Sequence, residues 1–165
     1  MENIFVSIVC LAVLLLGMGT LALGSFNSAD AMVYAMKEEE SQAASIRQTS
    51  ISSVSSTTYS AGTRADLYLD NTGQEALYDY GKWDVIVRYQ NGNVQWLPYG
   101  SSTPGWSVKS ILIDGRTEVF NPQIFDPSET IILTLKLQPA VSDNSTNVAT
   151  VATRYGVSAE VVFGH

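Results

Sequence analysis

IFVSIVCLAVLLLGMGTLAL, running from Ile4 to Leu23, is the stretch of sequence that decides the fold. No charged residue occurs between Asn3 and Ala29. A helix rises about 1.5 Å per residue, so this stretch is long enough to cross the hydrocarbon core of a bilayer, which is about 30 Å thick. It therefore predicts one of three roles: a secretion signal, a membrane anchor or the core of a filament.

The residues beside this stretch argue against the first two roles. A secretion signal begins with a positively charged region, and a single-span anchor usually carries Lys or Arg on its cytoplasmic flank. Here the first basic residue is Lys37. We expect either that a basic leader has been removed or that the helix packs among other protein helices.

The helical pattern continues beyond Ala29. Apolar residues recur at helix-like intervals as far as Ile46, and charged residues between Asp30 and Arg47 provide a solvated side. We expect the helix to end within Ser50–Tyr59, where Ser, Thr and β-branched residues disfavour it. The residues expected to pack in a core between helices are Ile4, Phe5, Ile8, Leu11, Leu14, Leu15, Gly17, Met18 and Leu21.

From Tyr59 onward the apolar period changes from 3.6 to 2. Asn91-Gly92 is a strong signal for a β-hairpin. Short alternating segments separated by turns, without a second helix, predict an antiparallel sandwich of about eight strands. The expected strands are 65–69, 83–89, 94–97, 108–113, 117–120, 130–137, 148–153 and 157–163. The predicted fold class is α+β, with a long hydrophobic helix in residues 1–58 and an immunoglobulin-like β-sandwich in residues 59–165.

Composition and charge argue against several function classes. The formal net charge of −7 disfavours nucleic-acid binding, which needs a basic face. The single histidine is His165 and the single cysteine is Cys10, so neither a zinc site nor a histidine-based catalytic triad is expected. Asp66 and Asp70 share a strand face that we interpret as solvated. We therefore expect no catalytic residue, no cofactor and no metal.

Two features suggest contacts or modification. Trp96, Tyr99 and Trp106 predict either a partly exposed rim that contacts another subunit or residues of the sandwich core. Asn144-Ser145-Thr146 matches the acceptor sequence for N-glycosylation.

Three segments resemble the archaellin and archaeal type IV pilin-like superfamily. LYLDNTG, from Leu67 to Gly73, resembles a strand and turn of archaellins and of the archaellum F and G stator subunits. DPSETIILTL, from Asp126 to Leu135, resembles their acidic turn before a core strand, and YGVSA, from Tyr155 to Ala159, resembles the turn before their closing strand. Bacterial type IV pilins have a glutamate where this chain has Phe5, which favours the archaeal branch.

The resemblance implies a structural, non-catalytic subunit of an extracellular helical filament, such as an archaellum used for motility. Many copies would assemble through their N-terminal helices after transient residence in the membrane. The alternative that it implies is a membrane-anchored stator subunit whose sandwich binds the cell-surface layer.

Overall fold

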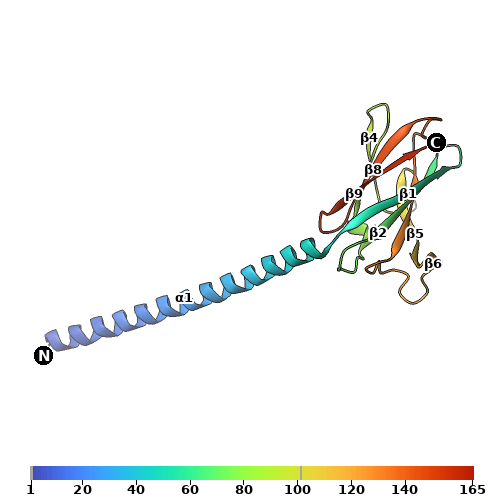
Figure 1. Ribbon diagram of the computed structural model, residues 1–165. Coiled ribbons are helices and arrows are strands. Elements are labelled where there is room, and N and C mark those ends of the chain that lie inside the picture. Colours follow the sequence, from blue (N-terminus) through green and yellow to red (C-terminus); the bar gives the residue numbers. More distant parts are fainter. Residues whose placement is uncertain (1, 101) are drawn as a thin grey trace. The chain divides into compact units, whose positions relative to one another are not determined.

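The computed structural model describes residues 2–100 and 102–165. It divides the chain into two compact units, Met1–Ala43 and Ala44–His165. The first unit is helical and belongs to α1 (Glu2–Gln48), whose last turn lies in the second unit (Figure 1). The side chain of Phe5 lies outside the described residues, and with it the packing role predicted for Phe5.

Hydroxyl side chains within and just after α1 donate to the backbone of the helix. No proline interrupts it. The hydroxyl of Thr20 donates to the carbonyl oxygen of Gly17 over 2.9 Å, and that of Ser25 donates to Leu21 over 2.9 Å. At its end, the amide and the hydroxyl of Thr49 both donate to the carbonyl oxygen of Ser45, at 3.0 and 2.7 Å.

The predicted fold class needs correction. Although α1 has 47 residues, no helix in the part of the chain that the structure describes combines the length and apolarity needed to cross a membrane. Beyond α1, the described residues form antiparallel sheets and the one-turn helix η1 (Tyr80–Lys82). The fold is therefore mainly β and resembles a β-sandwich.

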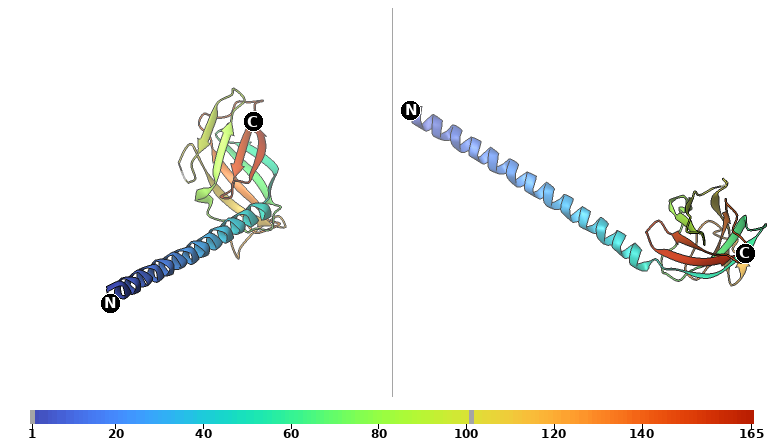
Figure 2. Two further views of the ribbon diagram at one scale, coloured as in Figure 1. Left: turned by 90° about the vertical axis from the view of Figure 1, so that its left-hand side faces the viewer. Right: turned by 90° about the horizontal axis from the view of Figure 1, so that it is seen from above.

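Two antiparallel sheets make up the second unit. One has the order β1-β2-β7-β5-β6, and the other has the order β4-β3-β8-β9. The strands are β1 (Ile51–Tyr59), β2 (Arg64–Asn71), β3 (Asp84–Arg88), β4 (Val94–Leu97), β5 (Gly105–Ile113), β6 (Arg116–Thr117), β7 (Thr130–Lys136), β8 (Thr146–Ala152) and β9 (Ser158–Gly164). The two sheets face each other in the views of Figure 2.

Alternating side chains fill the space between the sheets. In β2 and β7 the fully buried residues include Leu67, Leu69 and Leu133, and in β9 the buried residues alternate with exposed ones. This is the period of 2 that a two-layer β fold requires. The other buried apolar residues include Leu77, Trp83, Val85, Val87, Leu97, Trp106, Phe125, Ile131, Leu135, Ala149, Val151, Val161 and Phe163.

The strand predictions are confirmed in part. The hairpin at Asn91-Gly92 joins β3 to β4, with Gly92 at φ 88° and the Tyr89 amide donating to the Asn93 carbonyl. The segment Ile51–Tyr59, where we expected the helix to end, is strand β1. Its Ser, Thr and Val residues favour a strand as much as they disfavour a helix. The sandwich thus begins well before the predicted boundary at Tyr59.

Candidate functional site

The two longer motif segments, Leu67–Gly73 and Asp126–Leu135, meet at one end of the first sheet. Asn71 exchanges backbone hydrogen bonds with the turn before β7. Its amide donates to the carbonyl oxygen of Glu129, and its carbonyl oxygen accepts from the amide of Ser128. Its side-chain amide donates to the carbonyl oxygens of Glu75 and Phe125, each over 2.9 Å. Asn71 is 1% exposed, so these bonds satisfy groups that water does not reach.

The same end holds the last residues of α1. The Gln74 amide donates to the Gln48 carbonyl oxygen over 2.7 Å, and the hydroxyls of Ser50 and Thr72 lie 2.8 Å apart. Gly73 packs directly on this backbone. The Asn-Thr-Gly turn therefore fixes the point at which the chain passes from helix to strand.

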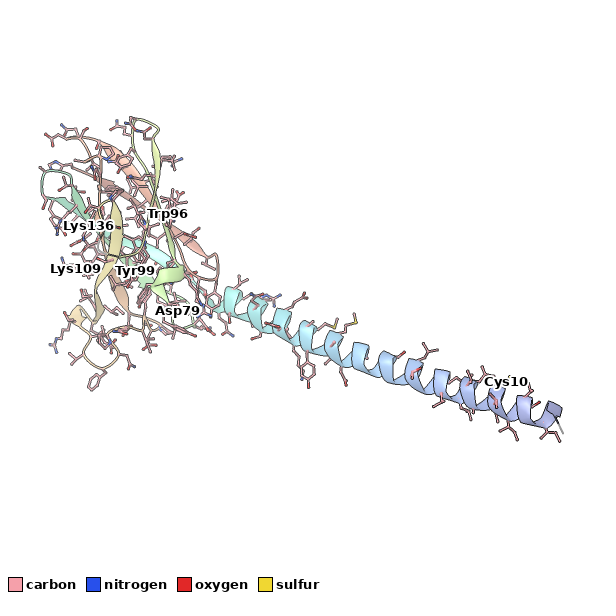
Figure 3. The ribbon with its side chains drawn as sticks, turned by 180° about the vertical axis from the view of Figure 1, so that it is seen from behind. Cys10, Asp79, Trp96, Tyr99, Lys109 and Lys136 are labelled. Atoms are coloured by element: carbon pink, nitrogen blue, oxygen red, sulfur yellow. The ribbon has the colours of Figure 1, made fainter. Side chains whose placement is uncertain are left out.

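The three aromatic residues predicted to form an exposed rim differ in their burial. Trp106 is fully buried and lies edge-on to Tyr99, with ring centroids 4.9 Å apart. Because no surface of Trp106 is exposed, it is a core residue and offers nothing to a second subunit. Trp96 and Tyr99 are both exposed and are labelled in Figure 3. A contact through these two side chains stays a prediction.

Beside Tyr99 lies a groove of about 790 Å³. Its lining includes Tyr78, Tyr80 and Tyr99, together with residues of β5 and of the segment that follows β6. Burial, reinforced by Tyr99 and nearby carboxylates, raises the pKa of Tyr80, so this phenol is neutral. The groove offers aromatic faces and hydroxyl groups together with the charged side chains of Asp79, Lys109 and Glu118.

A buried carboxylate lies at the turn before β7. Glu129 is 3% exposed, and its Oε2 accepts from the Asp126 amide over 2.6 Å. Burial raises the pKa of Glu129; the Asp126 amide partly offsets this, and the charges of Glu118 and Asp126 add to it. Among the described residues, no group of three His, Cys, Asp or Glu side chains could hold a metal ion.

Asp66 is the buried polar centre that sequence reasoning missed. We expected it on a solvated face, yet it is only 4% exposed. Its carboxylate accepts from Lys109 Nζ at 2.6 Å, Thr134 Oγ1 at 2.7 Å and Tyr59 Oη at 3.1 Å. Burial alone would raise the pKa of Asp66, but these donors outweigh it and lower the pKa below its usual value.

The Asp66 cluster ties together four strands of one sheet, namely β1, β2, β5 and β7. The β5–β7 register shifts between Val108 and Ser110, which leaves Lys109 at a bulge. A bulge redirects a side chain, and here Lys109 reaches across to Asp66. Strand alternation places Asp66 on the outer face of the sheet. Side chains from neighbouring strands, namely Tyr59, Lys109 and Thr134, cover it there.

The packing residues predicted in α1 are exposed where the structure describes their side chains. Ile4, Ile8 and Leu14 are each about 60% exposed or more. Nothing lies within 4 Å of a Cβ built on Gly17. The packing partners would have to come from another chain, so this role stays a prediction. The remaining members of the set, Leu11, Leu15, Met18 and Leu21, are exposed in the same way.

The glycosylation acceptor lies in an exposed loop. Asn144 has φ 55°, and its backbone amide donates to the carbonyl oxygen of His165 over 2.9 Å. Its side chain is exposed, as the reaction requires. Whether Asn144 is modified stays a prediction.

The comparisons with known proteins rest on structure. No protein-family model and no curated protein sequence matches the chain. The archaellum periplasmic stator protein FlaG from Sulfolobus acidocaldarius is 22% identical with a TM-score of 0.56, and the match covers 70% of this chain and 99% of FlaG. A chain of the FlaF–FlaG stator complex from the same organism gives 20% identity and a TM-score of 0.55, covering 68% of this chain and 87% of the other.

The archaeal flagellum of Methanospirillum hungatei strain JF1 matches over a longer range. Its identity to this chain is 15% and its TM-score 0.57, with 92% of this chain and 88% of the other covered. At these identities the likeness concerns the fold. The resemblance inferred from the motif segments is thus confirmed at that level, and the chain has the fold of archaellum proteins.

Proposed function

We propose that this chain is a non-catalytic component of an archaellum that acts as a stator subunit at the cell surface or in the periplasm. The observation that carries the proposal is the extent of the match to FlaG: almost all of that stator protein corresponds to part of this chain. The β-sandwich unit would thus supply a complete stator domain.

The internal bonding of the sandwich suits a part that must resist force. Asp66 connects four strands across the face of one sheet through charge-assisted and hydroxyl hydrogen bonds. Such bonds are shorter and stronger than neutral ones. At the end of α1, the bond from Gln74 to Gln48 joins the helix terminus to the turn after β2. Force entering at that terminus would pass directly into the sheet.

A stator subunit must also bind another component of the cell envelope. In our proposal this is a partner protein or the cell-surface layer, bound through exposed aromatic residues of the sandwich. Trp96 and Tyr99 are the candidate contacts, since both are exposed and aromatic side chains are favoured anchors in interfaces. The acidic net charge makes nucleic acid an unsuitable partner.

A filament subunit is the second candidate, and one observation favours it. The match to the Methanospirillum flagellum covers 92% of this chain and therefore includes most of α1. In that role the apolar side chains exposed on α1, such as Leu14, would pack against other copies and form a homo-oligomeric filament outside the cell.

Cell fractionation separates the two roles. We would shear surface appendages from cells of the source organism and quantify this chain in the sheared material and in the cell envelope. A stator subunit is expected in the envelope, at few copies, and cells lacking it should still bear filaments. A filament subunit is expected as the major sheared protein, and cells lacking it should bear none. Full filaments and normal swimming without the chain would contradict both.

A further inference from the structure

The outer face of the sheet β4-β3-β8-β9 carries an exposed apolar surface. Strand register places its side chains in two rows, the first Val94–Arg88–Val148–Val162 and the second Trp96–Ile86–Thr150–Glu160. We call these eight residues the sheet-face patch. Val94, Trp96 and Val162 are each more than half exposed, and Ile86 is 39% exposed. Contiguous apolar side chains on a soluble sheet mark an interaction site.

Trp96 is held in place although it is exposed. Its indole nitrogen donates to the Asp84 carboxylate over 3.0 Å, across the β3–β4 hairpin. A side chain fixed before binding loses little conformational entropy when a partner covers it. Tryptophan in this state is a typical hot spot of protein interfaces. Trp96 is therefore the natural anchor of the sheet-face patch.

Two opposite charges flank the apolar residues. Arg88 lies on β3 and Glu160 on β9, with β8 between them. With strands about 4.8 Å apart and a rise of about 3.3 Å per residue, these two positions are roughly 12 Å from each other. Neither side chain makes an ion pair or hydrogen bond within the part of the chain that the structure describes. Both charges are thus free to pair with another molecule.

This arrangement is complementary to itself. A two-fold axis that lies between two such faces, perpendicular to the line from Arg88 to Glu160 and passing through its midpoint, brings Arg88 of each copy opposite Glu160 of the other. Both ion pairs form at once, and the apolar residues around Val148 meet at the axis. A partner with a patch of one charge would satisfy only one of the two groups and oppose the other.

We propose that a second copy of this chain docks face to face on the sheet-face patch, anchored by Trp96 and aligned by two reciprocal Arg88–Glu160 pairs. The proposal concerns the sandwich alone and does not depend on whether the chain is a stator or a filament subunit. It differs from association through α1, because it uses the outer face of one sheet.

A charge swap in the full-length chain tests the arrangement. Arg88→Glu and Glu160→Arg each place like charges opposite one another, so we expect each to weaken self-association at least 10-fold in sedimentation velocity at low salt. The double variant Arg88→Glu/Glu160→Arg restores both pairs and should recover the wild-type association. Arg116→Glu is the matched control, because Arg116 is exposed on the other sheet. Every chain keeps the same α1, so association through α1 contributes equally to all of them.

Trp96→Ala provides a second measurement. The side chain is exposed, so we expect thermal unfolding to change little while self-association falls at least 10-fold. The proposal is overturned if the wild-type chain associates no more tightly than Arg88→Glu. It is also overturned if the double variant stays as weak as the single variants, because the two charges would then not face each other. In that case the patch would serve a different partner.

Discussion

The backbone amide of Gln74 lies 2.7 Å from the carbonyl oxygen of Gln48, so the last residue of α1 is hydrogen-bonded to the turn that follows β2. Helix termini leave carbonyl groups without partners inside the helix, and this bond satisfies one of them. It requires close approach of two backbones. Gly73 makes that approach possible.

Replacing Gly73 with alanine should destabilise the sandwich. A Cβ at this position would lie 2.4 Å from the Gln48 carbonyl oxygen and 2.5 Å from the Ser50 nitrogen, and both are backbone atoms that cannot rotate away. We expect Gly73→Ala to lower the free energy of unfolding, measured by urea denaturation, by about 2 kcal/mol. Gly81→Ala is the control, since its Cβ would meet only a Tyr99 ring atom at 3.9 Å. Equal stability of the two variants would refute the close-packing argument.

The side chain of Asn71 should contribute to the stability of the sandwich. Asn71→Ala removes the donors to Glu75 and Phe125 and the acceptor of the Gly73 amide. Phe125 and Gly73 keep their backbone bonds to Leu77 and Ser50, whereas the Glu75 carbonyl loses its bond to Asn71. Because Asn71 is buried, we expect a loss of about 3 kcal/mol in the free energy of unfolding. Asn91→Ala removes only one hydrogen bond, in an exposed turn, and should cost much less. A small effect at Asn71 would mean that water replaces the lost bonds.

These residues also indicate how far sequence reasoning reaches. The motifs Leu67–Gly73 and Asp126–Leu135 could be recognised from sequence as strands with turns, because alternation and turn residues are local signals. Their contact through Asn71 could not, because it depends on the pairing of β2 with β7. The strand β1 was missed for a related reason: an edge strand exposed on most of its length shows no apolar alternation.

Burial of single side chains was the least predictable property. Trp106 and Tyr99 occur in similar sequence surroundings, yet one is core and the other exposed. Asp66 alternates outward with Tyr68 and Asp70. It is enclosed by Lys109 at the bulge and by the hydroxyls of Tyr59 and Thr134. Such enclosure arises from side chains on strands distant in sequence, which a pattern of period 2 does not record.

The Asp66 cluster predicts a pH dependence. The pKa of Asp66 is lowered in the folded state from 3.8, so its ionised form stabilises the fold above that value, and the contribution is lost as pH falls through the folded-state pKa. We expect Asp66→Asn to lower the free energy of unfolding by about 2 kcal/mol at neutral pH, and by less as the pH falls below 3.8. Asp70→Asn, which alters one hydrogen bond on the same strand face, is the control. A difference that persists unchanged at acid pH would argue against the charge as its cause.

Ionisation of Glu129 should destabilise the fold, whereas ionisation of Asp66 should stabilise it. Its pKa is raised in the folded state from 4.5, so ionisation costs stability as pH rises from that value through the folded-state pKa. Glu129→Gln keeps an oxygen to accept from the Asp126 amide and removes a charge beside Glu118. We expect the variant to be more stable than wild type at neutral pH by on the order of 1 kcal/mol, with the difference shrinking toward pH about 4. Urea denaturation at several pH values measures it, and a less stable variant at neutral pH would contradict the assignment.

The apolar side chains of α1 offer the test that bears most directly on function. Leu14 is 60% exposed in the single chain, so replacing it with arginine costs nothing there. If copies of α1 pack together, Leu14→Arg buries an unpaired charge and costs several kcal/mol per subunit. A filament subunit carrying it should then fail to appear in sheared appendages under the electron microscope, while its sandwich unfolds at the wild-type temperature. Gln42→Arg introduces the same charge at an exposed polar position of α1 and should leave assembly intact. Normal filaments built from the Leu14→Arg chain would rule out packing through this face of α1.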